Sequence, residues 1–192
     1  MRAQQAGSTR DRILDVALDL FSRKGYEGTS IRDIAEEMSM TKAAVYYHFP
    51  SKEELLADVL NPAMARVGRV LEEHEPVRDP AGRRAFVTAL VEVIAEVGPR
   101  VVMMLNDPAV GSHIRALTGG SGLPQRVAGA LLGTGATDPG AAATERIRAA
   151  CAVATLPAGI AAWRQDNPRQ AHLDDATKSV LVEVVLAVVG RR

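Results

Sequence analysis

The stretch at residues 30–49, SIRDIAEEMSMTKAAVYYHF, decides the fold of this chain. Ser30 with Asp33 has the pattern of a capping box, and a short helical periodicity follows it. Thr41 is a typical N-cap for a second short helix, which Pro50 ends because proline cannot continue a helix. Two short helices around a turn of about four residues have helix-turn-helix spacing. The stretch therefore predicts a helix-turn-helix.

The two predicted helices divide their side chains between an inner and an outer face. Ala35 is the small residue that lets the helices cross closely, and an apolar set fills the space beneath them: Ile34, Met38, Val45 and Phe49. The outer face of the second helix is then free to enter a DNA major groove. Its hydroxyl, ammonium, methyl, phenol and imidazole groups all suit contacts with phosphates or base edges: Thr41, Lys42, Ala43, Tyr46, Tyr47 and His48.

Tyr46 and Tyr47 give this prediction its strongest support. They cannot both be buried on a helix that also buries Val45 and Phe49, so at least one faces outward. The alternative is that they pack against the helix that follows. We interpret His48 as a packed or capping side chain rather than a titrating group.

Arg32 and Lys52 stand at the starts of two predicted helices, where exposed amides also attract phosphate oxygens. We predict that both contact DNA. Simple exposure to solvent is an equal alternative for Arg32, as for most charged side chains.

Net charge adds nothing to this argument. The 192 residues contain 23 Lys and Arg and 23 Asp and Glu, and residues 1–56 contain eight basic and nine acidic side chains. Attraction to phosphate therefore has to come from local placement and helix N-termini.

The sequence at this point resembles the TetR-type regulators. Residues 25–35, GYEGTSIRDIA, and 42–55, KAAVYYHFPSKEEL, are similar to the N-terminal signature of that family, and the resemblance extends over about residues 9–60. It implies that DNA is contacted by Ser30, Thr41, Lys42, Ala43, Tyr46, Tyr47, His48 and Lys52. The sequence departs from the pattern at Ser39, where the family commonly has glycine, and a left-handed backbone there would cost stability.

The rest of the chain also reads as helices, which predicts an all-α protein. Ser8 with Asp11 starts a helix that Gly25 stops, and a capping box at Ser51 opens another that bends near Pro62. Further helices are expected at about residues 79–97, 100–105, 107–117, 123–132, 138–163 and 173–189. We predict a helix-turn-helix DNA-binding domain at residues 1–54 and a helical regulatory and dimerisation domain at 55–192.

The resemblance implies that the C-terminal part forms a homodimer through its last two long helices, about 141–164 and 173–190. Residues 141–163 and 180–189 are apolar on more than one face, which favours cover by a second subunit. The alternative is that both helices are buried inside one subunit. A dimer would place two recognition helices about one DNA turn apart and so require a palindromic operator.

The resemblance also implies an internal pocket for a small-molecule effector that the sequence does not identify. We predict its lining from residues that combine adaptable apolar surface with a polar atom: Phe86, Met103, Met104, His113 and Trp163. A methionine pair in a helix is more often plain core.

No pattern in the sequence indicates an enzyme or a cofactor. The four histidines lack metal-ligand spacing, and residues 119–122, GGSG, lack the strand and lysine of a phosphate loop. Cys151 is the only cysteine, which excludes an intrachain disulfide and favours inert packing over a redox sensor. The apolar run 180–189 is too short to span a bilayer, so we expect a cytoplasmic protein with no membrane contact.

The sequence thus predicts a ligand-responsive repressor that leaves its operator when it binds an effector. An activator, or a partner-binding helical protein that no longer reads DNA, are the alternatives. The partner-binding alternative is disfavoured because the chain keeps the residues suited to DNA contact: Lys42, Tyr46, Tyr47 and Lys52.

Overall fold

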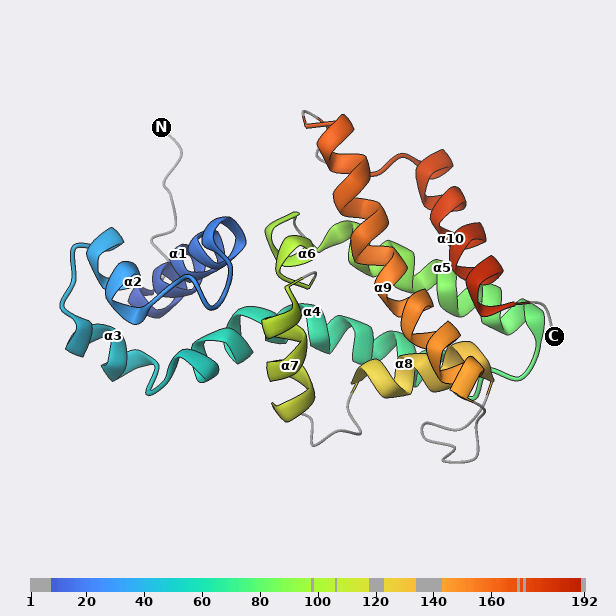
Figure 1. The fold of residues 1–192 in the computed structure, drawn as a ribbon, viewed down its shortest axis with the longest axis horizontal. Coiled ribbons are helices and arrows are strands. Elements are labelled where there is room, and N and C mark those ends of the chain that lie inside the picture. The colour runs from blue at the N-terminus through green and yellow to red at the C-terminus, as the bar shows by residue number, and fades with distance from the viewer. Residues whose placement is uncertain are drawn as a thin grey trace. The chain divides into compact units, whose positions relative to one another are not determined.

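The computed structural model describes residues 8–97, 99–105, 107–117, 123–133, 143–168, 170 and 172–190, and their regular structure is helical (Figure 1). The all-α prediction is confirmed. The helices are α1 Thr9–Lys24, α2 Ile31–Glu37, α3 Lys42–His48, α4 Lys52–His74, α5 Pro80–Glu96, α6 Pro99–Leu105, α7 Pro108–Leu117, α8 Leu123–Leu132, α9 Ala143–Asp166 and α10 Asp175–Val189.

The chain forms two compact units, Met1–Pro62 and Ala63–Arg192. The boundary lies inside α4, next to Pro62, and the sequence analysis placed it between residues 54 and 55. Helix α4 therefore contributes residues to both units.

The N-terminal unit is held by a small apolar core. One face of α1 buries Ile13, Ala17, Leu20 and Phe21, and the first part of α4 buries Leu55, Leu56, Val59 and Leu60. Leu14, at the edge of this α1 face, is half-buried. Helix α2 adds Ile31, Ile34 and Ala35, and α3 adds Val45.

Polar side chains set several helix starts, as the sequence predicted. Ser8 and Asp11 form the capping box of α1, and Asp79 caps α5 ahead of Pro80. Helix α10 begins two residues later than predicted, because Asp174 accepts the amide hydrogen of Thr177 at 2.7 Å and so caps it. The predicted start of α9 at 138–139 lies outside the described residues.

The C-terminal unit has a larger core, built by the end of α4 together with α5, α8, α9 and α10. Helix α10 lies against both α9 and α5. Ion pairs Arg84–Glu183 at 2.5 Å and Lys178–Glu92 at 2.9 Å join α5 to α10. Among the described residues, no helix has the length and apolar character needed to cross a membrane.

Candidate nucleic-acid interface

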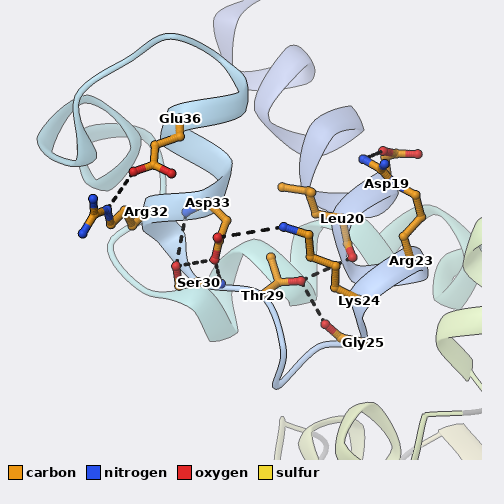
Figure 2. Close-up of polar contacts among 10 residues, drawn as sticks. All are labelled: Asp19, Leu20, Arg23, Lys24, Gly25, Thr29, Ser30, Arg32, Asp33 and Glu36. Carbon is orange, nitrogen blue, oxygen red and sulfur yellow. Dashed lines mark hydrogen bonds and ion pairs between the residues drawn. The ribbon is translucent and has the colours of Figure 1, made fainter.

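The connection between α1 and α2 is a tight turn that sets the position of the helix-turn-helix (Figure 2). Helix α1 ends at Gly25, whose φ of 77° is left-handed. Thr29 is buried, and its hydroxyl donates to the carbonyl oxygens of Gly25 at 2.9 Å and Leu20 at 3.3 Å. A Cβ on Gly28 would lie 2.3 Å from the carbonyl oxygen of Lys24. The turn therefore requires glycine at position 28.

Ser30 and Asp33 form the predicted capping box at the start of α2. The Asp33 amide donates to Ser30 Oγ at 3.2 Å, and the Ser30 amide donates to Asp33 Oδ2 at 2.7 Å. The Ser30 hydroxyl and the Ser30 amide both donate to the Asp33 carboxylate, and these two hydrogen bonds lower the pKa of this exposed carboxyl. Lys24 Nζ lies 3.9 Å from the same carboxylate and adds to the effect.

The turn between α2 and α3 contains the one non-glycine residue with positive φ among those described, Ser39 at 54°. Its amide donates to the Glu36 carbonyl at 3.0 Å, and the Met40 amide donates to the Ala35 carbonyl at 2.8 Å. The backbone at Ser39 is thus left-handed. A serine in this conformation costs stability relative to glycine, as expected from the sequence.

Helix α3 is anchored at both ends. Thr41 Oγ1 accepts the amide hydrogen of Ala44 at 3.2 Å, while Val45 and Phe49 are buried. The Arg10 guanidinium lies 4.7 Å from the centre of the Phe49 ring and also pairs with Asp58 of α4. A cation from α1 thereby joins the end of α3 to α4.

The opposite face of α3 is exposed. Tyr47 is 85% exposed and Tyr46 is 40% exposed, so both tyrosines face outward, where the sequence required at least one to do so. Lys42 Nζ lies 5.5 Å from the centre of the Tyr46 ring, and the half-buried His48 packs edge-on to Tyr47. Thr41, the N-cap of α3, and Ala43 on α3 are also exposed. The structure thus brings the predicted α3 residues to one surface.

Arg32 and Lys52, the two remaining predicted contacts, each have an intramolecular partner. Arg32 Nε lies 2.7 Å from Glu36 Oε1, and this hydrogen bond raises the pKa of the exposed guanidinium. Lys52 Nζ lies 4.0 Å from the centre of the Tyr26 ring. Neither partner was predicted from the sequence. The four-residue spacing of Arg32 and Glu36 on a helix was a usable signal, whereas Tyr26 and Lys52 meet only through the tertiary fold.

The predicted effector-binding residues lie in the C-terminal unit. Phe86 of α5 and Met104 of α6 are buried, Trp163 of α9 packs partly exposed against the core, and His113 of α7 is half-buried. The Met103 side chain lies outside the described part of the structure. A shared pocket for these residues stays a prediction.

Apolar side chains are also exposed on α9 and α10, two helices that pack against each other. Ile147 is 63% exposed, Val180 is 60% exposed and Val184 is 42% exposed. Cys151 and Ala154 are exposed one and two turns beyond Ile147 on α9. We call these five residues the α9–α10 apolar surface.

The N-terminal unit is similar to known bacterial transcriptional regulators. Residues 13–59 match the model of the family described as bacterial regulatory proteins, tetR family. The chain is 33% identical over 104 residues to the HTH-type transcriptional regulator AcrR of Shigella flexneri. It is 50% identical over 46 residues to IcaR of Staphylococcus aureus, a negative transcriptional regulator of a biofilm operon.

The curated matches cover only part of each protein. The AcrR match covers 52% of this chain and 48% of AcrR, and the IcaR match covers 24% and 25%. The chain therefore spans about half the length of AcrR and a quarter of IcaR. The fold is matched over a longer range. The TetR family transcriptional regulator PfmR of Thermus thermophilus is 28% identical, with a TM-score of 0.58 covering 94% of this chain and 100% of PfmR.

Proposed function

The chain is a TetR-type protein, and from this premise we propose that it is a non-enzymatic transcriptional regulator that binds double-stranded DNA through α3. The observation that carries the proposal is the division of α3 into two faces. Val45 is fully buried, whereas Tyr47 on the same helix is 85% exposed. A large, exposed aromatic side chain on a helix whose other face is fixed suits contact with base edges or sugars in a major groove.

Contacts to phosphate are proposed around this surface. Ser30 and Thr41 lie at helix starts, where amide groups and hydroxyls both suit an anion. Lys42 and Lys52 supply ammonium groups, and Arg32 supplies a guanidinium that Glu36 holds in place. Tyr46, Tyr47, Ala43 and His48 complete the proposed set on α3.

We propose that two copies of the chain pair through the α9–α10 apolar surface. Exposed Ile147, Val180 and Val184 support this, because large aliphatic side chains left exposed on two packed helices suit burial in a protein interface. Each copy would place one α3 on the DNA, so the operator would be palindromic. We also propose a cytoplasmic location, because the proposed DNA partner would be found there.

Repression is the proposed regulatory outcome, supported by the description of IcaR as a negative regulator. We further propose that an effector binds the C-terminal unit near Phe86, Met103, Met104, His113 and Trp163. Helix α4 is the proposed connection, because Leu71 near its end belongs to the core of that unit while Lys52 at its start is a proposed DNA contact. Effector binding would shift α4, change the separation of the two α3 helices and release the operator.

The experiment that tests DNA binding is selection of duplexes from a random pool by the purified protein at a fixed, stated salt concentration. We expect a palindromic consensus. Recovery of no consensus by folded, dimeric protein would contradict the proposal.

The effector mechanism needs a separate measurement. Spin labels on the two α3 helices of the dimer report their separation with and without a compound that releases the selected duplex. An unchanged separation in the presence of such a compound would contradict the proposed shift of α4.

A further inference from the structure

The Lys52 ammonium lies against the face of a buried tyrosine ring, and this contact suggests a role for a residue outside the proposed DNA surface. Lys52 is the first residue of α4, whereas Tyr26 lies in the turn between α1 and α2. The distance from Lys52 Nζ to the centre of the Tyr26 ring is 4.0 Å, within the range of a cation–π interaction.

The Tyr26 ring is held firmly. It is 2% exposed, and its centre lies 5.2 Å from that of Phe21 on α1. The Tyr26 carbonyl accepts the Thr29 amide hydrogen at 3.2 Å, within the turn whose geometry requires Gly28. The ring is therefore a fixed surface, unlike the 40% exposed Tyr46 that lies near Lys42.

The phenol end of Tyr26 is also constrained. Burial raises its pKa, and the neighbouring Glu53 carboxylate raises it further, so the phenol stays protonated at neutral pH. Tyr26 thus presents a neutral ring face to the Lys52 ammonium.

The contact still allows Lys52 to bind an anion. An ammonium group has three N–H donors, and a ring face meets one side of it. A free lysine side chain has several rotamers, and ordering it on binding costs free energy. A lysine already ordered against a ring avoids part of that cost.

We infer that Tyr26 is a positioning residue for DNA binding, whose ring orders the Lys52 ammonium at the start of α4 so that it meets a backbone phosphate. The inference rests on the proposed function. It assigns no DNA contact to Tyr26 itself, which acts through Lys52.

The test is a double-mutant cycle on the full-length protein, using the duplex that the wild type selects. Lys52→Met removes the charge and should weaken binding about 10-fold. Tyr26→Leu removes the ring but keeps apolar bulk, and should weaken binding about 3- to 10-fold. Tyr26→Phe, the matched control, keeps the ring and should stay within about 2-fold of wild type.

The double variant Tyr26→Leu/Lys52→Met distinguishes positioning from a merely structural role. If Tyr26 acts through Lys52, the double variant binds as Lys52→Met alone does. Fully additive losses would overturn the inference while leaving the proposed function intact. A wild type that selects no duplex would overturn the proposed function and this role with it.

A second measurement covers the case in which Tyr26→Leu does not fold. In the NMR spectrum of the free wild-type protein, the ring current of Tyr26 should move the Lys52 ε-methylene protons upfield of those of Lys24 and Lys178. Lys52→Arg identifies the Lys52 signals by their loss. Unshifted Lys52 signals would overturn the inference, whatever the binding data show.

Discussion

Two exposed surfaces of this protein are both helical, but their side chains differ in kind. The α3 surface presents hydroxyl, phenol and ammonium groups, with Tyr47 85% exposed. The α9–α10 apolar surface presents aliphatic groups such as Ile147, 63% exposed. Polar and aromatic side chains suit contacts with phosphates and base edges. Aliphatic side chains stabilise a complex only when another apolar surface covers them. Exposure alone therefore does not identify a binding partner. The chemistry of the exposed side chains is what distinguishes the proposed DNA surface on α3 from the proposed dimer interface on α9 and α10.

The largest expected effect comes from a charge placed on the α9–α10 apolar surface. Val180→Asp should produce a monomer, and affinity for the selected duplex should fall about 100-fold or more because the two α3 helices are no longer linked. Sedimentation gives the oligomeric state, and a titration gives the affinity. Ala85→Asp, at an exposed position of α5 in the same unit, is the control and should remain dimeric. A dimeric Val180→Asp protein would move the proposed interface away from α10.

The next largest effect concerns the backbone that supports the α3 surface. Gly28→Ala would place a Cβ 2.3 Å from the Lys24 carbonyl oxygen, so the free energy of unfolding should fall by about 2 kcal/mol or more. Chemical denaturation followed by circular dichroism measures it.

Gly68 on α4 supplies the matched control, because a Cβ there meets no atom within 4 Å. Gly68→Ala should raise the free energy of unfolding by about 0.5 to 1 kcal/mol, since alanine favours a helix. Equal effects of the two substitutions would contradict the close approach at position 28.

Tyr47→Ala tests the α3 surface, as Val180→Asp tests the α9–α10 apolar surface. Because the side chain is exposed, its loss should leave stability and dimer intact while affinity for the selected duplex falls about 10- to 30-fold. Tyr47→Phe then separates the ring from the hydroxyl. Unchanged affinity of Tyr47→Ala would remove Tyr47 from the proposed contacts.

The smallest expected effect lies in the turn before α3. Ser39 has a φ of 54°, which glycine adopts without strain, so Ser39→Gly should raise the free energy of unfolding by about 1 kcal/mol. Ser39→Ala keeps the Cβ and should give no gain, which makes it the control for loss of the hydroxyl. A stabilised Ser39→Ala protein would show that the backbone angle is not the cause.

Local patterns in the sequence predicted most of the helices. Capping boxes at Ser8 and Ser30, the stop at Gly25 and the block at Pro50 are decided by neighbours in the chain, so they are readable without the fold.

The partners of the candidate DNA contacts were less predictable. At least one of Tyr46 and Tyr47 was expected to be exposed because Val45 and Phe49 already required the inner face, and both are exposed. The contacts of Lys52 with Tyr26 and of Arg10 with Phe49 were not expected, since each joins residues that are far apart in the sequence.

The sequence by itself determined the helix-turn-helix, because caps, turns and helical periodicity act over three or four residues and leave their mark in the order of side chains. Only the tertiary structure decided which cations are held against rings and which aliphatic side chains stay uncovered on α9 and α10. These features depend on where separate helices meet, and burial of a side chain is a property of everything that packs around it.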